Sequence, residues 1–404
     1  MAIFQPSAVI GRLPEHYFRA LKEKVADYRA RGIDVIDLST GNPDGPTPEA
    51  IVRSLKDAAD KPENHGYPPF YGKPDTLRAV AEFYYREYSV ELDPDKEIAV
   101  FHGSGTGIMG IAHALLGKGD VLLTANPSYP PYYAAAALTG AEVHAVPVEE
   151  HSGFLPDYRE VSPDILKRVR LLLLNYPNNP TGAVATREFF EQILELAAEY
   201  HFPVVNDFAY GSLGFDGHKP ISLLQIPGAK EYGVEIYTLS KTYNMAGWRF
   251  GFAVGNASVI SALRLYHTHA YSTVFGAVQD AAATALLGPQ DQVRELTAKY
   301  ERRRDVLVSG LRDIGWEVAA PKGTFFAWLK LPEGRRSREF ADWLLEEAHV
   351  AVAPGEGFGT LGDAYVRVGL VSGEDRIAEA VRRIGRTGIF GDTAIALNEG
   401  GLRG

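Results

Sequence analysis

The sequence predicts an α/β protein with a mostly parallel sheet in a larger domain and a second, smaller α/β domain. From residue 75 onward, short runs of β-branched residues and leucine alternate with amphipathic helical patterns, which is typical of βαβ units. After Gly315 the pattern changes to strands with a hairpin character, interleaved with helices. The length of 404 residues allows two or three domains, each with a core of its own.

The expected elements follow from apolar periodicity and from Gly, Pro and Asn punctuation. A helix over 14–31 ends at Gly32, a short strand covers 34–39, and an irregular loop covers 40–48. Helices are then expected at 75–88, 106–117, 130–139, 187–200, 256–268, 274–287 and 289–314, and strands at 97–102, 120–125, 142–147, 169–175, 202–206, 234–239, 248–254, 316–321, 324–331, 350–354 and 365–370. The expected domains are an N-terminal arm of the small domain (1–47), a large domain (48–288), a small domain (289–385) and a Gly-rich tail (386–404).

Composition excludes several classes of function. The net charge of −10 argues against a nucleic-acid partner or an anionic membrane surface, because either would need a basic patch. The chain has no cysteine, which excludes disulfides, thiolate catalysis and Cys-type zinc sites, and we expect no metal. No apolar run approaches the length of a membrane span, and the first residues do not resemble a signal peptide. We therefore expect a cytoplasmic protein that acts on small molecules.

Lys241 lies between two β-type runs, 234–239 and 248–254. Poor solvation there favours the neutral amine and therefore Schiff-base chemistry. Arg249, eight residues later, offers a cation that can bind a phosphate bidentately. A Schiff-base lysine and a phosphate-binding arginine are what pyridoxal phosphate (PLP) requires. Taken alone, the segment also fits a surface lysine and an ordinary ion-pairing arginine.

A glycine-rich turn between a strand and a helix, FHGSGTGIMG (101–110), is a candidate phosphate site. Its Gly105, Gly107 and Gly110 formally match a dinucleotide fingerprint, but the next strand ends in Asn126 rather than in the acidic residue such a site needs. We interpret Ser104, Gly105 and Thr106 as a cradle for one phosphate. The alternative is a plain turn that needs glycine for positive φ.

Four further candidates, Tyr129, Asn179, Asp207 and Tyr210, lie near the ends of apolar strands, where open α/β sheets bind ligands, and a fifth, Arg367, lies within a strand. Tyr129 could stack on a planar ring, and Asn179 could donate to a phenolate oxygen; core packing and an Asx-turn are the alternatives. Asp207 could keep a pyridine nitrogen protonated, with Tyr210 reaching the same ring, or it could be a helix N-cap. Arg367 within an apolar strand needs an anion, either a substrate carboxylate or a structural acid.

The order and spacing of these segments, including PSY, YPNNPTG, NDFAY, SKTYNMAGWRFG and YVRVGL, resemble those of the class I/II aminotransferases of fold type I over residues 5–385. The resemblance implies a mostly parallel seven-stranded sheet, PLP as cofactor and a homodimer with shared active sites. It implies that Lys241 is the Schiff-base lysine and the proton-transfer group. The cofactor-binding residues it implies are Ser104, Gly105, Thr106, Tyr129, Asn179, Asp207, Ala209, Tyr210, Thr238, Ser240, Lys241 and Arg249, with Tyr67 lent by the second subunit. Gly41, Asn179 and Arg367 are implied to bind substrate.

Within this family the sequence of these segments is most similar to that of a bacterial branch that regenerates methionine by aminating 4-methylthio-2-oxobutanoate. The expected activity is transfer of an amino group between an L-amino acid and a 2-oxo acid. LL-diaminopimelate-type aminotransferases and a C–S β-lyase of the same fold are alternatives. The motifs assign no second arginine to a side-chain carboxylate, which slightly favours an apolar or thioether substrate.

Overall fold

The computed structural model of the chain describes residues 4–13 and 18–391. Contacts divide the chain into two units. The larger unit comprises residues 1–15, 42–298 and 322–324, and the smaller unit comprises residues 16–41, 299–321 and 325–404. The sequence-based boundaries near 47, 288 and 385 stay a prediction. Residues 14–17 of the first expected helix and residues 392–404 of the Gly-rich tail lie outside the described part.

The larger unit contains a seven-stranded sheet with the order β2-β8-β7-β6-β5-β3-β4. Its strands are β2 (Ile98–Phe101), β3 (Val121–Asn126), β4 (Glu142–Pro147), β5 (Val169–Leu174), β6 (Val204–Asp207), β7 (Gly233–Thr238) and β8 (Gly251–Gly255). Only β8 runs antiparallel to its neighbours. The predicted α/β class with a mostly parallel sheet is confirmed.

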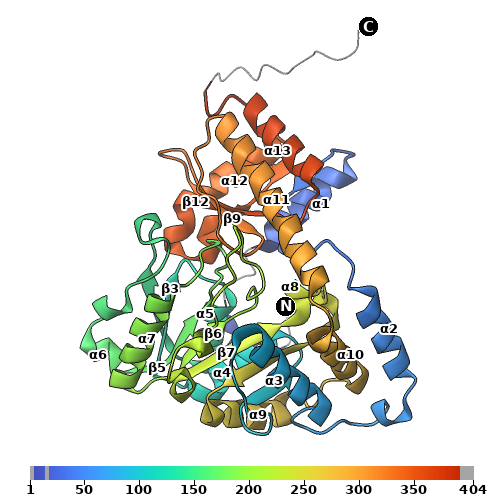
Figure 1. Cartoon of the computed structure of the whole chain (residues 1–404). Helices are drawn as coiled ribbons and strands as arrows, with labels where there is room; N and C mark the ends of the chain where they lie inside the picture. The colour runs from blue at the N-terminus through green and yellow to red at the C-terminus, as the bar shows by residue number, and fades with distance from the viewer. Residues whose placement is uncertain (1–3, 14–17, 392–404) are drawn as a thin grey trace. The chain divides into compact units, whose positions relative to one another are not determined.

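Helices cover both faces of this sheet (Figure 1). One face carries α3 (Pro74–Tyr88), α6 (Pro163–Leu166) and α7 (Arg187–Tyr200), with α2 (Glu49–Ala59) and α10 (Gly276–Leu287) packed against α3 directly or through each other. The other face carries α4 (Ser104–Leu115), α5 (Pro131–Thr139) and α9 (Ala257–Ala270). Because both faces are covered, the central strands β6 and β7 are buried along their whole length, and β5 is buried except at Arg170.

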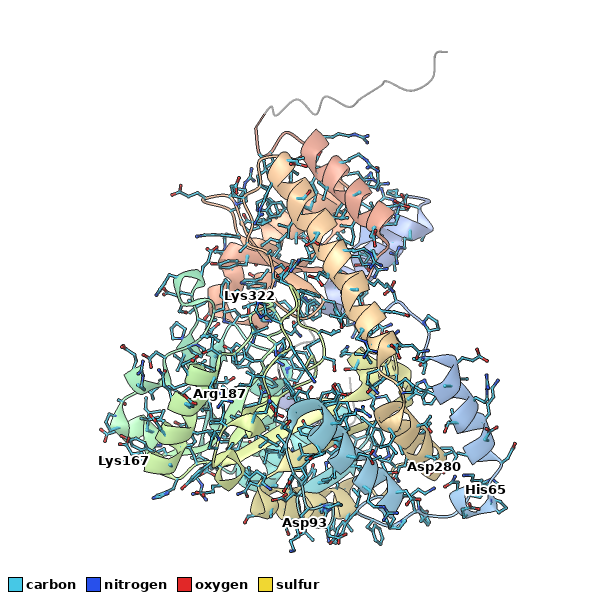
Figure 2. All side chains as sticks on the ribbon, in the orientation of Figure 1. His65, Asp93, Lys167, Arg187, Asp280 and Lys322 are labelled. Atoms are coloured by element: carbon cyan, nitrogen blue, oxygen red, sulfur yellow. The ribbon has the colours of Figure 1, made fainter. Side chains whose placement is uncertain are left out.

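Many charged side chains lie on the outside of these layers. Lys167, Arg187 and His65 are exposed at the periphery of the larger unit (Figure 2). The short helix α8 (Leu239–Thr242) follows β7 directly. Within residues 4–13 and 18–391, no helix is long and apolar enough to cross a membrane.

The smaller unit contains a three-stranded antiparallel sheet, β11 (Ala353–Pro354), β12 (Tyr365–Gly369) and β9 (Phe326–Lys330), and a parallel pair, β1 (Ile36–Asp37) and β10 (Val350–Ala351). Its helices are α1 (Phe18–Ala30), α12 (Ser337–Glu347) and α13 (Glu374–Arg386). The long helix α11 (Asp291–Asp313) contributes residues to both units.

Short 3-10 helices occur in both units. They lie at Ile10–Arg12, Pro62–Asn64, Glu150–Ser152, Tyr158–Glu160, Leu223–Gln225, Ala229–Glu231, Ala246–Trp248, Gly355–Phe358 and Thr360–Ala364.

Most predicted bounds agree within two or three residues, but the strand predicted at 316–321 is wrong. The carbonyl of Val318 accepts from the Arg312 guanidinium at 2.8 Å instead of from a neighbouring strand, and Pro321 has no N–H to donate. The helix α4 begins at Ser104, two residues earlier than expected, because Gly103 adopts φ +85° directly before it. The helix α2 was not predicted.

Candidate active site

The candidate residues of the larger unit gather at the carboxyl edge of the parallel strands. Lys241 lies in α8, which begins directly after β7. Thr238, the last residue of β7, caps this turn, because its hydroxyl oxygen accepts from the Ser240 N–H at 3.2 Å. The same hydroxyl group lies 2.9 Å from Ser240 Oγ. The short helix therefore presents Lys241 from a fixed, capped turn.

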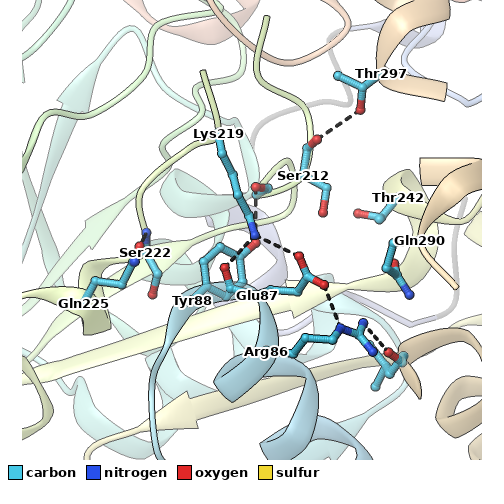
Figure 3. Close-up of polar contacts among 12 residues, drawn as sticks. Arg86, Glu87, Tyr88, Ser212, Lys219, Ser222, Gln225, Thr242, Gln290 and Thr297 are labelled. Atoms are coloured by element: carbon cyan, nitrogen blue, oxygen red, sulfur yellow. Dashed lines mark hydrogen bonds and ion pairs between the residues drawn. The ribbon is translucent and has the colours of Figure 1, made fainter. Parts of the chain in front are cut away.

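A second set of bonds holds the far end of this turn. The Tyr237 hydroxyl lies 3.1 Å from Thr242 Oγ1 and 2.8 Å from Ser212 Oγ. Figure 3 shows Ser212 and Thr242 pointing toward each other, and Thr297 donates to the Ser212 carbonyl at 3.1 Å. Since Tyr237 is completely buried, the residue that follows Lys241 is anchored in the core rather than in solvent.

An anion-binding cradle forms where the N-terminus of α4 meets Arg249. A Cβ atom added at Gly103 would collide with the Arg249 guanidinium, and one added at Gly251 would lie 3.0 Å from the Ser104 nitrogen. Gly251 pairs with Thr238 across β7 and β8, which brings this cradle beside the Lys241 turn. Free N–H groups at a helix N-terminus and a guanidinium together favour a phosphate.

Asp207 ends β6 and is buried. Its Oδ2 atom accepts from the Tyr132 hydroxyl at 2.9 Å, whereas its Oδ1 atom has no hydrogen-bond partner among the described residues. Burial raises the pKa of Asp207 to about 6, although the Tyr132 hydroxyl, the Ala209 backbone and the charge of Lys241 act in the opposite direction. A buried oxygen without a donor is costly, so this atom fits a protonated ring nitrogen such as that of PLP.

Tyr132 was not singled out by sequence reasoning. It lies three residues after Tyr129 at the start of α5, and the two rings meet edge to face with centroids 5.6 Å apart. The segment PSYPPYY (127–133) offers three tyrosines, and only packing decides which one reaches Asp207. The spacing from Tyr129 by nearly one helical turn is the signal that would have found it.

The loop that carries Asn179 is bound to Asp207 through Asn175. The Asn175 amide donates to the Asp207 carbonyl at 2.6 Å, and its Oδ1 atom accepts from the Asn179 N–H at 2.7 Å. Asn175 and Asn179 are both buried, and Ala209 and Tyr210 are buried directly after β6. The larger unit thus brings together Ser104, Gly105, Thr106, Tyr129, Asn179, Asp207, Ala209, Tyr210, Thr238, Ser240, Lys241 and Arg249.

Arg367 and Gly41 belong to the smaller unit. The guanidinium carbon of Arg367 lies 4.0 Å from the ring centroid of Phe326 and 4.7 Å from that of Phe358, and Nη2 donates to the Ser39 carbonyl at 2.9 Å. A Cβ atom added at Gly41 would approach Phe326 to 2.7 Å, so this position requires glycine. The rings hold a buried cation in a defined orientation.

Tyr67 lies in the larger unit and is 90% exposed, with Phe70 and Tyr71 exposed beside it in sequence. The described residues contain no cluster of His, Asp or Glu that could hold a metal ion.

Comparisons with known proteins identify the family of the chain. Residues 33–384 match the family model for aminotransferase class I and II. The chain is 51% identical over 392 residues to the L-glutamine–4-(methylsulfanyl)-2-oxobutanoate aminotransferase of Bacillus subtilis, which covers 97% of this chain and 98% of the relative. It is 42% identical to the LL-diaminopimelate aminotransferase of Desulforudis audaxviator, with 93% and 96% covered.

Solved structures show the same relationship. The substrate-bound BacF structure from Bacillus subtilis matches with a TM-score of 0.92 and 40% identity, over 97% of this chain and all of that chain. The aspartate aminotransferase of Thermotoga maritima matches with a TM-score of 0.88 and 28% identity, over 95% and 99%. The chain therefore belongs to the class I and II aminotransferases of fold type I, a PLP-dependent family, and is a transaminase.

Proposed function

We propose that the chain binds PLP at the carboxyl edge of its larger sheet and transfers an amino group from glutamine to 4-(methylsulfanyl)-2-oxobutanoate, which yields methionine. The observation that supports the cofactor assignment is the buried Oδ1 atom of Asp207, which has no donor among the described residues and faces a site that also contains Lys241. The substrate assignment rests on the 51% identity to the Bacillus subtilis relative with that name.

Each residue of the site has a role in this proposal. Lys241 would hold the cofactor aldehyde, and Ser104, Gly105, Thr106, Thr238, Ser240 and Arg249 would hold its phosphate. Tyr129 and Ala209 would lie on the two faces of the ring, and Asn179 and Tyr210 would donate to its phenolic oxygen. Asp207 would pair with the ring nitrogen and keep it protonated. In the smaller unit, Gly41 and Arg367 would bind the substrate carboxylate, together with Asn179.

The cofactor, when bound, supplies an electron sink for the charge left at the substrate Cα after proton removal. Lys241 Nζ, once free and neutral, accepts that proton as the general base. Its capped turn fixes the backbone from which the Lys241 side chain extends, since Thr238 and Tyr237 bind the two ends of α8. Arg367 would hold the amino acid by its carboxylate and so restrict its orientation.

The first test is Lys241→Ala. We expect it to abolish turnover and the absorbance band of the covalently bound cofactor. Lys167→Ala, an exposed lysine on the periphery of the same unit, is the matched control and should retain both. An active Lys241→Ala enzyme that keeps the band would contradict the assignment.

The second test identifies the substrate. The PLP form is mixed with single amino acids, and conversion to the pyridoxamine form is followed by absorbance. Glutamine and methionine should convert it fastest. The LL-diaminopimelate aminotransferases are 40–43% identical relatives, and faster conversion by LL-diaminopimelate would select that alternative. Release of pyruvate without a 2-oxo acceptor would instead indicate a C–S β-lyase.

We also propose a homodimer in which Tyr67 reaches the phosphate site of the partner subunit. The aromatic side chains of Tyr67, Phe70 and Tyr71 are exposed in the single chain, and such a group favours a surface that a second subunit covers. Tyr67→Ala should weaken PLP binding. Mixed dimers of Tyr67→Ala and Lys241→Ala chains test the sharing, because one of their two sites would contain both native residues. Failure of mixing to restore that site's PLP affinity would exclude it.

A further inference from the structure

Glu235 is a completely buried acid that the transamination chemistry does not use. It lies in the middle of β7, and four groups donate to its carboxylate. Ser222 Oγ and the Tyr84 hydroxyl donate to Oε2 at 2.6 Å and 3.1 Å. The Leu223 N–H and the Asn206 amide donate to Oε1 at 2.8 Å and 3.2 Å. Burying such an acid has a large desolvation cost, and an apolar residue would often serve stability equally well.

One of these donors leads directly to the active site. Asn206 pairs in register with Glu235 across β6 and β7, so their side chains share one face of the sheet. The next residue, Asp207, therefore points to the opposite face, where Tyr132 of α5 contacts it. At the end of β6, Asn206 therefore bonds to Glu235 on one face of the sheet, and Asp207 faces the candidate site on the other.

Asn206 binds the backbone of Tyr176 at both polar atoms. Its Oδ1 atom accepts from the Tyr176 N–H at 3.0 Å, and its amide donates to the Tyr176 carbonyl at 3.3 Å. Tyr176 follows Asn175, whose amide is bound to the Asp207 carbonyl. The loop 175–179 is therefore bound to the end of β6 at two successive residues, Asn175 to the Asp207 backbone and Tyr176 to the Asn206 side chain.

The carboxylate of Glu235 fixes which way the Asn206 amide faces. An asparagine amide can be turned over so that its oxygen and nitrogen exchange places. With an acceptor at Oε1, only the orientation that directs Nδ2 toward Glu235 is favourable, and that orientation leaves Oδ1 for the Tyr176 N–H. Ser222 and Gln225 hold the Glu235 end through a capping box on the 3-10 helix Leu223–Gln225, and both are drawn in Figure 3.

We propose that Glu235 and Asn206 are positioning residues of the transaminase, which set the Asn179 loop and Asp207 at a fixed separation and thereby hold the groups that flank the cofactor ring. This proposal rests on the proposed cofactor-binding roles of Asn179 and Asp207. Neither Glu235 nor Asn206 is assigned contact with the cofactor, so their effect reaches it only through loop 175–179 and the end of β6.

The test uses full-length Asn206→Ala, Glu235→Leu and Glu235→Gln enzymes. Two quantities are measured: the Kd of the apoenzyme for PLP, and the pH at which the absorbance of the bound cofactor changes. Asn206→Ala and Glu235→Leu should each raise Kd about tenfold, the change that corresponds to one buried hydrogen bond. They should also shift the absorbance transition, because the donor to the phenolic oxygen and the partner of the ring nitrogen are displaced.

Glu235→Gln should restore both quantities toward the wild-type values. Its amide oxygen can face Asn206 and the Leu223 N–H, while its NH₂ group donates to the hydroxyl oxygens of Ser222 and Tyr84. The control is Leu286→Ala in α10, a cavity variant in the same core cluster whose apolar side chain makes no hydrogen bond to this network. It lowers thermal stability and should leave Kd and the absorbance transition unchanged.

Wild-type values in Asn206→Ala, or changes in Leu286→Ala as large as those in Asn206→Ala, would overturn the proposal. If Glu235→Leu does not fold, Asn206→Ala carries the test, since Glu235 keeps three donors there. The proposed function fails separately, through absence of PLP binding by the wild-type protein itself.

Discussion

Asp207 and Glu235 are two buried acids on neighbouring strands of the same sheet, and they are satisfied in opposite ways. Glu235 receives four hydrogen bonds, two at each oxygen. Asp207 receives a side-chain bond at Oδ2 and leaves Oδ1 without a partner among the described residues. Burial raises the pKa of both acids, to about 6 for Asp207 and about 7 for Glu235. Burial alone therefore does not distinguish them.

The difference lies in whether the protein supplies all the donors. When both oxygens of a buried acid accept hydrogen bonds from the protein, the acid needs no further donor once the chain has folded. Its role is then to hold its donors in place. An acid with one oxygen left over still needs a cation or donor from outside, and a protonated ring nitrogen can supply it. Position agrees with this, because Asp207 ends its strand whereas Glu235 lies within one.

The largest expected effect is on catalysis at the unfilled acid. Asp207→Asn keeps the size of the side chain but cannot hold the ring nitrogen protonated, so we expect kcat/KM to fall about a thousandfold, as when one preorganised electrostatic group is lost. Single-turnover conversion with glutamine measures it. Glu235→Gln, the same change at the filled acid, should lose less than about tenfold. Equal losses in the two variants would remove the distinction.

The next effect is on the pH dependence of stability. Burial raises the pKa of Glu235 from 4.5 to about 7, so the folded apoprotein holds its proton where the unfolded chain has lost it. Stability from this group is therefore fully present below pH 4.5 and is lost as the pH rises to about 7. The stability of Glu235→Gln relative to wild type should therefore rise by about 3 kcal/mol between pH 4 and pH 8.

Asp207 should behave in the same direction, from pH 3.8 to about 6, but only without cofactor. A cation at Oδ1 favours the charged form and would lower that pKa again. Urea unfolding of apoenzyme and PLP-loaded enzyme at several pH values measures both parts. If the pH-dependent stability that Glu235 contributes disappeared on PLP loading, the titrations of the two acids would be coupled.

The third effect concerns the donor to Asp207. Tyr132→Phe removes the 2.9 Å bond to Oδ2, and since that bond lowers the pKa of Asp207, its loss raises that pKa further. We expect kcat/KM to fall about tenfold, more at pH 6 than at pH 8. Tyr133→Phe is the matched control on the same helix, because its hydroxyl contacts the Ala125 carbonyl, at 3.4 Å, and Ser128. A similar loss in Tyr133→Phe would assign the effect to α5 as a whole.

Much of the fold could be predicted from local signals. The helix α7 begins and ends at the predicted residues, because Thr186 caps it and His201 adopts a left-handed conformation at its end. The strand predicted at 316–321 failed, since its apolar residues pack without a partner strand and Arg312 takes a carbonyl it would have needed. Whether an extended run joins a ladder depends on tertiary neighbours, which periodicity does not contain.

The site divides in the same way. Lys241 and Asp207 could be singled out, because Asp207 ends an apolar strand and Lys241 lies in the short helix that follows one, at the sheet edge where ligands bind. Tyr132, Asn206 and Glu235 could not. A polar residue inside a strand usually marks a solvent-facing side, yet helices cover both faces here and Glu235 is completely buried. Its donors come from α3, β6 and a 3-10 helix, which are 12 to 151 residues away along the chain.

The smallest effect separates the two oxygens of Glu235. Tyr84→Phe removes a 3.1 Å bond at Oε2, where Ser222 still donates at 2.6 Å, and leaves Oε1 and Asn206 untouched. We expect a loss of about 1 kcal/mol in the free energy of unfolding, with no change in the Kd for PLP. Urea unfolding and PLP titration of the same preparations measure the two quantities. A weaker PLP affinity in Tyr84→Phe would mean that the charge of Glu235, rather than its bond to Asn206, acts on the site. The effects of Glu235 and Asp207 would then differ through electrostatics and not through their hydrogen bonds.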